Sequence, residues 1–308
     1  MTTNAIQSSH IYSTYFAPRG RSRIYTLGMQ IAQLYLSPFD QIIGFIGEAG
    51  SGKSVLIKGM FPGIELTNDD DGVNVRPLPL LEQEYETGFF TPHTYHLDIR
   101  FETGFHQLSE LADAVRLAVR RGKRIIIEHF DLIYPLLGVN ANLLIGVGEQ
   151  IVITRPNLFG PLPQELCDIV YPSLAYRLMA HSAEDLCEYA MTQEQMLACS
   201  HGDIRHGFVL EFNEHQPDID IPALEARVNE LIRADLPIDY YDESHILLGG
   251  VQHYCTGPRT HVRSTGRIIG FRLLDHFIYD HFHKTYMLVG CVGDDSEENI
   301  RKLETIHG

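Results

Sequence analysis

The stretch QIIGFIGEAGSGKS occupies residues 41–54 and contains the pattern G-x-x-x-x-G-K-[ST] between Gly47 and Ser54. An apolar run, Ile42–Ile46, precedes the glycines and suits a buried strand, while residues 55–60 continue with the spacing of a helix. A strand, a glycine-rich loop and the start of a helix, in this order, form the context that a phosphate-binding loop requires. The sequence therefore predicts that this region binds a nucleoside triphosphate.

The residue types of the loop match the chemistry of a bound triphosphate. Glycines let backbone N–H groups turn toward phosphate oxygens, and the N-terminus of the following helix adds a favourable dipole. Lys53 can reach the β- and γ-phosphates, and Ser54 offers a hydroxyl group to Mg²⁺. We therefore expect ATP and Mg²⁺ as cofactors. The predicted nucleotide-binding residues are Gly47, Glu48, Ala49, Gly50, Ser51, Gly52, Lys53 and Ser54.

The composition indicates a globular protein with a large negative charge. The chain has 308 residues, 44% of them hydrophobic, and a formal net charge of −16. Binding to nucleic acid in general needs a basic surface, so the charge disfavours tRNA as a partner without excluding a local basic groove. The five cysteines show no framework spacing, the N-terminus lacks the features of a signal peptide, and no apolar run approaches the ~20 residues of a membrane helix. We expect a cytoplasmic protein with no membrane partner.

Two acidic positions that follow predicted strands are candidates for catalysis. Residues 69–71 are three aspartates after a short predicted strand, residues 64–67, where an acid can orient an acceptor hydroxyl or hold Mg²⁺; the alternative is an acidic turn. Residues 125–127 are three isoleucines, as in a strand buried on both faces, and Glu128 follows them. An acid at that place typically holds Mg²⁺ or polarises water. The catalytic candidates are Lys53, Asp70, Asp71 and Glu128, with Ser54 and Glu128 as Mg²⁺ ligands.

The segment HTYHLD, residues 93–98, combines histidines, an aromatic ring and a carboxylate. Such side chains can line a nucleoside pocket. Tyr95, Leu97 and Ile99 also alternate as in a half-buried strand, and each single histidine here is interpreted as a structural residue.

Strands and helices alternate through the first half of the chain. A helix is predicted for residues 107–121, and two short strands follow at Leu143–Val147 and Gln150–Thr154. This alternation predicts a parallel α/β sheet with helices on both faces. The breakers in NLFGPLPQ, residues 157–164, indicate a linker. The predicted organisation is an N-terminal segment of residues 1–40, an ATP-binding domain of residues 41–162 and a C-terminal domain of residues 163–308.

The first half resembles the uridine kinase-like branch of the P-loop kinases. The resemblance rests on the phosphate-binding loop, the aspartates at 69–71, PHTYHLD at residues 92–98 and GKRIIIEHFDLIYP at residues 122–135. It implies a P-loop NTPase fold in which one aspartate among 69–71 is the base for the acceptor hydroxyl and Glu128 lies near Mg²⁺. The chain departs from this family where the kinases carry an arginine-rich lid, because residues 150–164 contain Arg155 alone.

The second half resembles the second additional domain of threonyl- and alanyl-tRNA synthetases, which implies an α+β fold. The matching segments are HSAEDL at residues 181–186, HGFVLEF at 206–212, PALEARVNELIRADLPI at 222–238 and YCTGPRTHVRSTGRIIGFRLL at 254–274.

The same resemblance implies a metal or aminoacyl site made of His181, Asp185, Cys255 and His261. Asp185 stands where the family has a second histidine, and residues 259 and 260 are inserted before His261. His181 and Asp185 are spaced i, i+4, so they project from one helix face, and histidine, carboxylate and thiolate can bind Zn²⁺. The alternative is ordinary polar packing in a vestigial site.

Three functions follow from these observations. The first is Mg²⁺-dependent transfer of the ATP γ-phosphate to a small hydroxyl acceptor, such as a nucleoside. The second is a trans-acting hydrolase of mischarged aminoacyl-tRNA in which the phosphate-binding loop is regulatory. The third is a nucleotide-gated binding module without turnover. The acids after the predicted strands favour the first.

Overall fold

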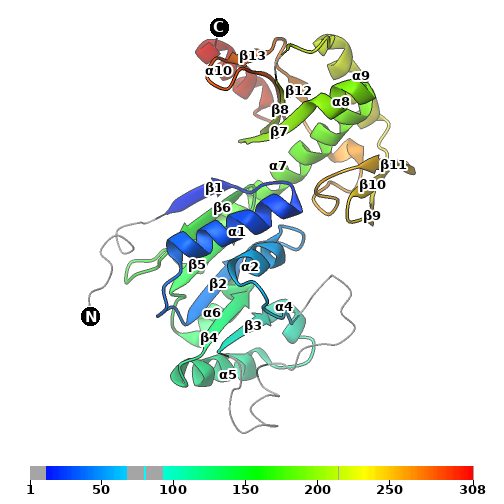
Figure 1. Ribbon diagram of the computed structural model, residues 1–308. Coiled ribbons are helices and arrows are strands. Elements are labelled where there is room, and N and C mark those ends of the chain that lie inside the picture. Colours follow the sequence, from blue (N-terminus) through cyan, green and yellow to red (C-terminus); the bar gives the residue numbers. More distant parts are fainter. Residues whose placement is uncertain (1–11, 68–79, 81–92, 214, 308) are drawn as a thin grey trace. The chain divides into compact units, whose positions relative to one another are not determined.

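The computed structural model describes residues 12–67, 80, 93–213 and 215–307 (Figure 1). The chain divides into two compact units, and each unit has buried hydrophobic clusters of its own. The first unit comprises Met1–Ala17 and Arg21–Pro172, and the second comprises Pro18–Gly20 and Ser173–Gly308. The division falls within one helix, Pro163–Ala190, whose first residue is also the first residue of the predicted C-terminal domain.

The first unit contains a six-stranded sheet in the order β1-β6-β5-β2-β4-β3. β2 pairs in parallel with β4 and with β5, and β4 pairs in parallel with β3. β6 runs antiparallel to both of its neighbours, β5 and β1. The strands are β1 (Ser13–Phe16), β2 (Ile42–Ile46), β3 (Thr94–Asp98), β4 (Arg124–Glu128), β5 (Leu143–Val147) and β6 (Gln150–Thr154).

The prediction of a parallel sheet is therefore wrong at one edge, and the sheet is mixed. Only Gly148 and Glu149 separate β5 from β6. Two residues can join antiparallel neighbours in a hairpin, whereas a parallel crossover needs a dozen or more residues. The parallel arrangement holds for the four strands β2 to β5.

Helices cover both faces of this sheet. Successive residues of a strand point to opposite faces, so Ile43 and Phe45 join a buried cluster with α1 and α2, whereas Ile42 and Ile46 join another with α5 and α6. Because β2 and β4 are parallel neighbours, their carboxyl ends lie at the same edge of the sheet. The helices are α1 (Arg21–Tyr35), α2 (Lys53–Met60), α4 (Ile99–Glu102), α5 (Leu108–Arg120), α6 (Phe130–Leu137) and the first part of α7 (Pro163–Ala190).

The second unit combines antiparallel sheets with helices, which is an α+β arrangement. One sheet has the order β12-β14-β8-β7 with β13 also paired to β14, and the other has the order β11-β10-β9. The strands are β7 (Cys199–Ile204), β8 (Gly207–Asn213), β9 (Ile238–Asp242), β10 (His245–Leu248), β11 (Val251–Tyr254), β12 (Arg272–Leu273), β13 (Ile278–Asp280) and β14 (Thr285–Cys291). The helices are the rest of α7, α8 (Gln193–Ala198), α9 (Ile221–Arg233), the 3-10 turn η1 (Thr265–Arg267) and α10 (Ser296–His307).

The larger sheet of the second unit packs helices on its two faces. Phe208, Leu210 and Phe212 of β8 join a buried cluster with α7 and α9, and Val209 of the same strand joins a smaller one with residues of α10. None of the described helices in either unit combines the length and the apolar composition that a membrane crossing requires.

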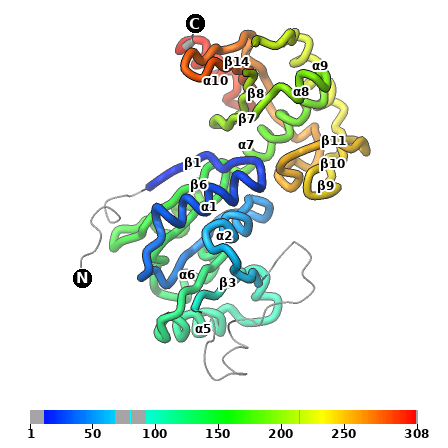
Figure 2. The backbone as a smooth tube through the Cα atoms, viewed as in Figure 1, coloured from blue at the N-terminus to red at the C-terminus, as the bar shows by residue number. Residues whose placement is uncertain are grey.

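Two glycines let α1 and α2 approach closely, and the helices lie side by side (Figure 2). A Cβ atom on Gly28 of α1 would lie 2.5 Å from the carbonyl oxygen of Leu56, and one on Gly59 of α2 would lie 2.2 Å from that of Tyr25. These neighbours are backbone atoms, which cannot move out of the way as the end of a flexible side chain can, so a larger residue at either position would force the helices apart. Because α2 begins at Lys53, this packing positions the helix that follows the glycine-rich loop of residues 47–52.

Gly28→Ala is expected to destabilise the first unit. Overpacking of this kind costs about 1–3 kcal/mol, more than the roughly 1 kcal/mol of helix propensity that alanine gains over glycine. Gln30→Ala is the matched control, because Gln30 is exposed on the same helix. Urea unfolding followed by circular dichroism compares the three proteins. A Gly28→Ala protein as stable as Gln30→Ala would contradict the close helix contact.

Candidate functional site

The loop of residues 47–52 joins β2 to α2 and wraps around the side chain of Lys53. Lys53 Nζ donates hydrogen bonds to the carbonyl oxygens of Gly47 at 2.8 Å and Glu48 at 2.9 Å. Gly50 and Gly52 have φ angles of 79° and 89°, in the left-handed region that glycine adopts without a steric penalty. The ammonium group is buried, and oxygen atoms of the loop take the place of its water shell.

Glu128 lies against this loop because β4 is the parallel neighbour of β2. Ser54 Oγ donates a hydrogen bond of 3.1 Å to Glu128 Oε1, and Lys53 Nζ lies 3.7 Å from Glu128 Oε2. The structure thus brings together Lys53, Ser54 and Glu128, three of the predicted site residues. Asp70 and Asp71 lie outside the described residues.

His96 is a site residue that the sequence did not single out. Its Nε2 lies 3.2 Å from Glu128 Oε1, and its Nδ1 accepts a hydrogen bond of 3.1 Å from the backbone N–H of Thr67. Because Nδ1 is the acceptor, Nε2 carries the proton and donates it to the carboxylate. Residues 64–67, predicted as a strand, are irregular; Thr67 instead contacts β3 through His96 and through the backbone N–H of Asp98.

The electrostatics of this cluster favour an ionised carboxylate. Burial alone would raise the pKa of Glu128, but the hydrogen bond from His96 and the charge of Lys53 lower that pKa to about 2. Burial lowers the pKa of Lys53, and the charge of Glu128 opposes this effect. Burial and the charges of Lys53 and Arg100 lower the pKa of His129 to about 4, so this ring is neutral at pH 7. Glu128 is therefore deprotonated at neutral pH.

Asp98 and His129 extend the cluster around Glu128. One donor atom from each of Asp98, Glu128 and His129 lies within 4.8 Å of the others, and all three residues are buried. Asp98 and Glu128 are paired residues at the ends of adjacent parallel strands. His129 has a φ angle of 56°, in the left-handed region, and residues held in this conformation cluster at functional sites.

Two arginines near the sequence motifs occupy different places. Arg100 of α4 makes a bidentate ion pair with Glu48 of the loop, at 2.9 and 3.2 Å. Arg155, the lone arginine of the lid region, pairs with Asp40 at 2.7 and 2.8 Å. Asp40 lies two residues before the start of β2, so Arg155 lies at the opposite end of that strand from the loop.

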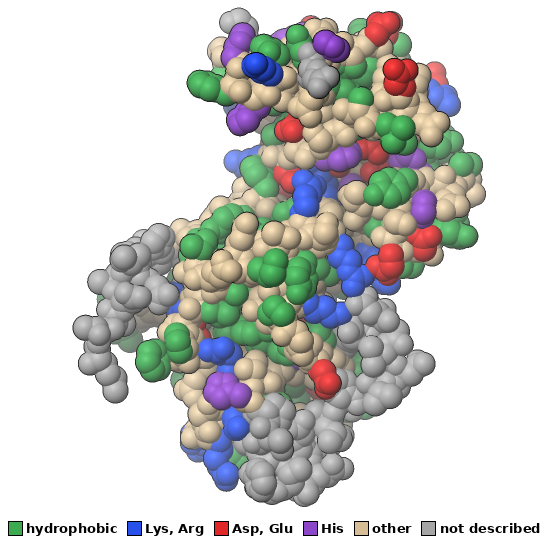
Figure 3. Space-filling model, viewed as in Figure 1, with side chains coloured by type: hydrophobic (Ala, Val, Ile, Leu, Met, Phe, Trp, Pro, Cys, Tyr) green, Lys and Arg blue, Asp and Glu red, His purple; other side chains and the backbone are tan. Residues whose placement is uncertain are grey.

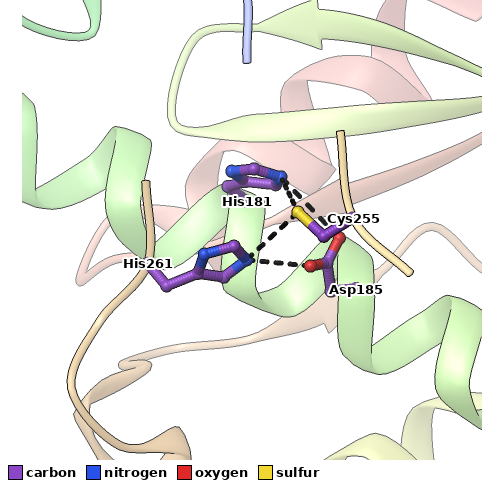
Figure 4. Close-up of side chains that lie close together, drawn as sticks. All are labelled: His181, Asp185, Cys255 and His261. Atoms are coloured by element: carbon purple, nitrogen blue, oxygen red, sulfur yellow. Dashed lines mark hydrogen bonds and ion pairs between the residues drawn. The ribbon is translucent and has the colours of Figure 1, made fainter. Parts of the chain in front are cut away.

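A second candidate site lies in the second unit, where histidine side chains are frequent on the face shown in Figure 3. His181 and Asp185 project from α7 toward Cys255, which follows β11, and toward His261 (Figure 4). Cys255 Sγ lies 3.4 Å from His181 Nε2 and 3.7 Å from His261 Nε2. Asp185 Oδ1 lies 3.7 Å from His181 Nε2, and Asp185 Oδ2 lies 2.8 Å from His261 Nε2. The structure brings all four predicted residues together.

Neighbouring carbonyl oxygens orient the two histidine rings. His181 Nδ1 lies 3.0 Å from the carbonyl oxygen of Thr260, and His261 Nδ1 lies 3.3 Å from that of Pro258. For His181, the carbonyl oxygen requires Nδ1 to be the donor, which leaves its Nε2 as a lone pair that faces Cys255. His261 Nε2 also faces the cluster and forms a hydrogen bond with the Asp185 carboxylate. Tetrahedral Zn²⁺ with bonds of about 2.0–2.3 Å separates its ligand atoms by about 3.3–3.7 Å. Three of the four distances between ligand atoms given above fit this range. The fourth, 2.8 Å between Asp185 Oδ2 and His261 Nε2, is that of a hydrogen bond.

Burial controls the protonation of these groups. It raises the pKa of the Cys255 thiol far above its ordinary value and lowers that of His181. Burial would also raise the pKa of Asp185, but the neighbouring histidines hold it well below its usual range. Before any metal binds, Cys255 is therefore a thiol, His181 a neutral imidazole and Asp185 a carboxylate, and metal binding would have to release the thiol proton.

Comparisons with known proteins add little to this geometry. No protein-family model matches the sequence, and no curated protein matches it. Among solved structures, the chain is weakly similar to an amino transferase from Eubacterium rectale, with a TM-score of 0.22 and 14% identity over 74% of this chain and 67% of that one. A similarity of this size carries no argument about fold or function.

The pKa of Glu128 predicts acid destabilisation of the first unit in metal-free buffer. The pKa falls from 4.5 to about 2 on folding. The carboxylate therefore contributes stability that is fully present above pH 4.5 and is lost as the pH falls toward 2, about 3 kcal/mol in total. We expect Glu128→Gln to lose less stability than the wild-type protein between about pH 6 and about pH 3 in urea unfolding. Equal losses would contradict the assigned pKa.

Proposed function

We propose that the first unit binds ATP with Mg²⁺ at residues 47–54 and transfers the γ-phosphate to a small hydroxyl compound. The observation that carries the proposal is the 3.1 Å contact between Ser54 Oγ and Glu128 Oε1, beside the ammonium group of Lys53. A hydroxyl group and an ionised carboxylate are the oxygen ligands that Mg²⁺ prefers, and a lysine at this place neutralises phosphate charge. When bound, Mg²⁺ supplies charge stabilisation to the transferred phosphoryl group.

The topology of the sheet supports a P-loop NTPase fold for this unit. From β2 the chain passes through α2 to β3, returns to β4 beside β2, and then crosses to β5 on the other side of β2. In open α/β sheets, ligands bind outside the carboxyl ends of the strands at such a reversal of strand order. The loop, Glu128 and the start of α2 all lie at this end of β2 and β4.

The chain's own residues explain how a triphosphate would be held. Lys53 Nζ, now bonded to two loop carbonyl oxygens, would exchange these partners for phosphate oxygens. His96 keeps Glu128 oriented and ionised through its hydrogen bond. Backbone N–H groups at the start of α2 face the same space. Catalysis would come mainly from positioning and charge stabilisation, with an aspartate among residues 69–71 as the proposed base.

Lys53→Ala is expected to reduce ATP-dependent activity by about 100-fold or more, because a preorganised charge on the transferring group is lost. ADP formation with Mg²⁺, ATP and a panel of nucleosides is the measurement. Lys58→Ala, which removes one lysine from the same helix away from the loop, is the matched control and should keep full activity. Full activity of Lys53→Ala would contradict the proposal. Tight ATP binding without turnover by any acceptor would favour the nucleotide-gated module instead.

We further propose that His181, Asp185, Cys255 and His261 bind Zn²⁺ in the second unit. Their separations and the orientation of both imidazole rings support this assignment. Four protein ligands complete a tetrahedral shell, as in structural zinc sites, whereas catalytic sites keep one position for water. The arrangement therefore favours a structural role for this ion over the alternative, a hydrolase of mischarged aminoacyl-tRNA.

Cys255→Ser is expected to weaken Zn²⁺ binding by about 100-fold or more, since losing even an outer-shell partner costs 10- to 100-fold. Zinc content after dialysis and the melting temperature with and without a chelator measure the effect. His276→Asn, which alters an exposed histidine paired with Asp275, should behave like the wild-type protein. Unchanged zinc content in Cys255→Ser would contradict the ligand set. Aminoacyl-tRNA deacylation that depends on Cys255 or His261 would favour the hydrolase.

A further inference from the structure

The ligand-bearing side chains of the second unit form a row that extends beyond the proposed zinc site. His181, Asp185 and Glu188 are spaced i, i+4 and i+7 on α7, so they lie along one face of the helix. His253 of β11 and Cys255 just after it are spaced i, i+2, so they lie on one side of an extended segment. The helix face and this side of the segment meet along their length. Glu188 and His253 therefore continue the row past Asp185.

The buried ring nitrogen Nε2 of His253 is a candidate metal ligand. The residue is 7% exposed, and no hydrogen bond from any described residue reaches Nε2. The nearest charged atom is Glu188 Oε2, at 4.0 Å, and the edge-on ring of Tyr189 covers the imidazole on another side. A buried polar atom without a partner is rare in folded proteins and commonly marks a place for an ion or a water molecule.

The buried acidic side chains around Glu188 also favour the binding of a cation. Glu184, Asp185 and Glu188 are buried within five positions of one helix. Arg19 pairs with Glu184 at 3.1 Å and with Asp203 at 3.0 Å. Glu188 Oε1 lies 3.2 Å from His201 Nδ1, while Oε2 faces His253. Buried carboxylates are expensive unless they are paired or bind a metal ion.

We propose that a second divalent metal ion binds between Asp185, Glu188 and His253. One donor atom from each of these residues lies within 4.8 Å of the other two, and all three are buried. One imidazole and two carboxylates form a ligand set used by Zn²⁺ and other first-row divalent ions. Asp185 would be shared with the proposed Cys255-containing site, and to that extent the inference rests on the proposed function. The two positions together would form a dinuclear centre with a bridging carboxylate.

The two positions differ in what they leave open. The first has four protein ligands and is complete, whereas the second has three. A fourth ligand at the second position would be water or an oxygen atom of a bound anion. Metal pairs of this kind bind and polarise such oxygen ligands. The second position is thus where exogenous ligands would bind in this unit.

Titration of the metal-free full chain with Co²⁺ separates the two positions. Co²⁺ bound to Cys255 gives a sulfur-to-metal charge-transfer band in the near ultraviolet, whereas Co²⁺ at the second position has only nitrogen and oxygen ligands. The wild-type protein should bind about two equivalents at these positions, and any Co²⁺ bound by Asp98, Glu128 and His129 of the first unit adds equally in every variant. His253→Asn, and independently the isosteric Glu188→Gln, should each bind about one and keep the thiolate band.

His201→Asn is the matched control. His201 contacts Glu188 from the other side and belongs, with Cys199, to a rival group of donors. This variant should still bind about two equivalents. A wild-type protein that binds one equivalent with the thiolate band would overturn the second position and leave the zinc site standing. Two equivalents in both His253→Asn and Glu188→Gln, or loss of the second ion in His201→Asn, would also overturn it. A folded wild-type protein that binds no metal would overturn both assignments.

Discussion

The ion pair between Lys53 and Glu128 connects the glycine-rich loop of residues 47–52 to the neighbouring strand, with Nζ 3.7 Å from Oε2. Both groups are buried, so each would be costly without partners. The loop carbonyl oxygens surround the ammonium group, while Ser54 and His96 donate to the carboxylate. The strands, the loop and Thr67 all contribute to this one arrangement, because each supplies a polar partner to Lys53, to Glu128 or to His96.

Much of the first unit can be predicted from its residues, and the omissions have physical reasons. The loop has a specific pattern, and an acid directly after three isoleucines indicates the end of a buried strand, so Lys53, Ser54 and Glu128 were accessible from the sequence. His96 was not, because a single histidine in an alternating strand has no spacing that distinguishes a polar contact from packing. The antiparallel direction of β6 could have been predicted from the two residues that connect it to β5, because a connection this short is too short for a parallel crossover.

In the second unit, the sequence alone does not show which distant residues come together in the site. Helix spacing places His181 and Asp185 on one face of α7, but Cys255 and His261 come from a segment about 70 residues later, and only the resemblance to the synthetase domain joined them. Glu188 and His253 extend the same two periodicities, at i+3 from Asp185 and i−2 from Cys255. That signal was present but weak, since acids and histidines at such spacings are also common on solvated faces.

A crystal structure of the full chain with Mg²⁺ and a non-hydrolysable ATP analogue is the decisive test of ATP binding at the loop. Lys53 Nζ is expected to leave the carbonyl oxygens of Gly47 and Glu48 for the β- and γ-phosphates. Mg²⁺ is expected to bind Ser54 Oγ with Glu128 in its immediate surroundings. A triphosphate bound away from the loop, or one bound there with Lys53 still on the two carbonyl oxygens, would contradict the proposed role of Lys53.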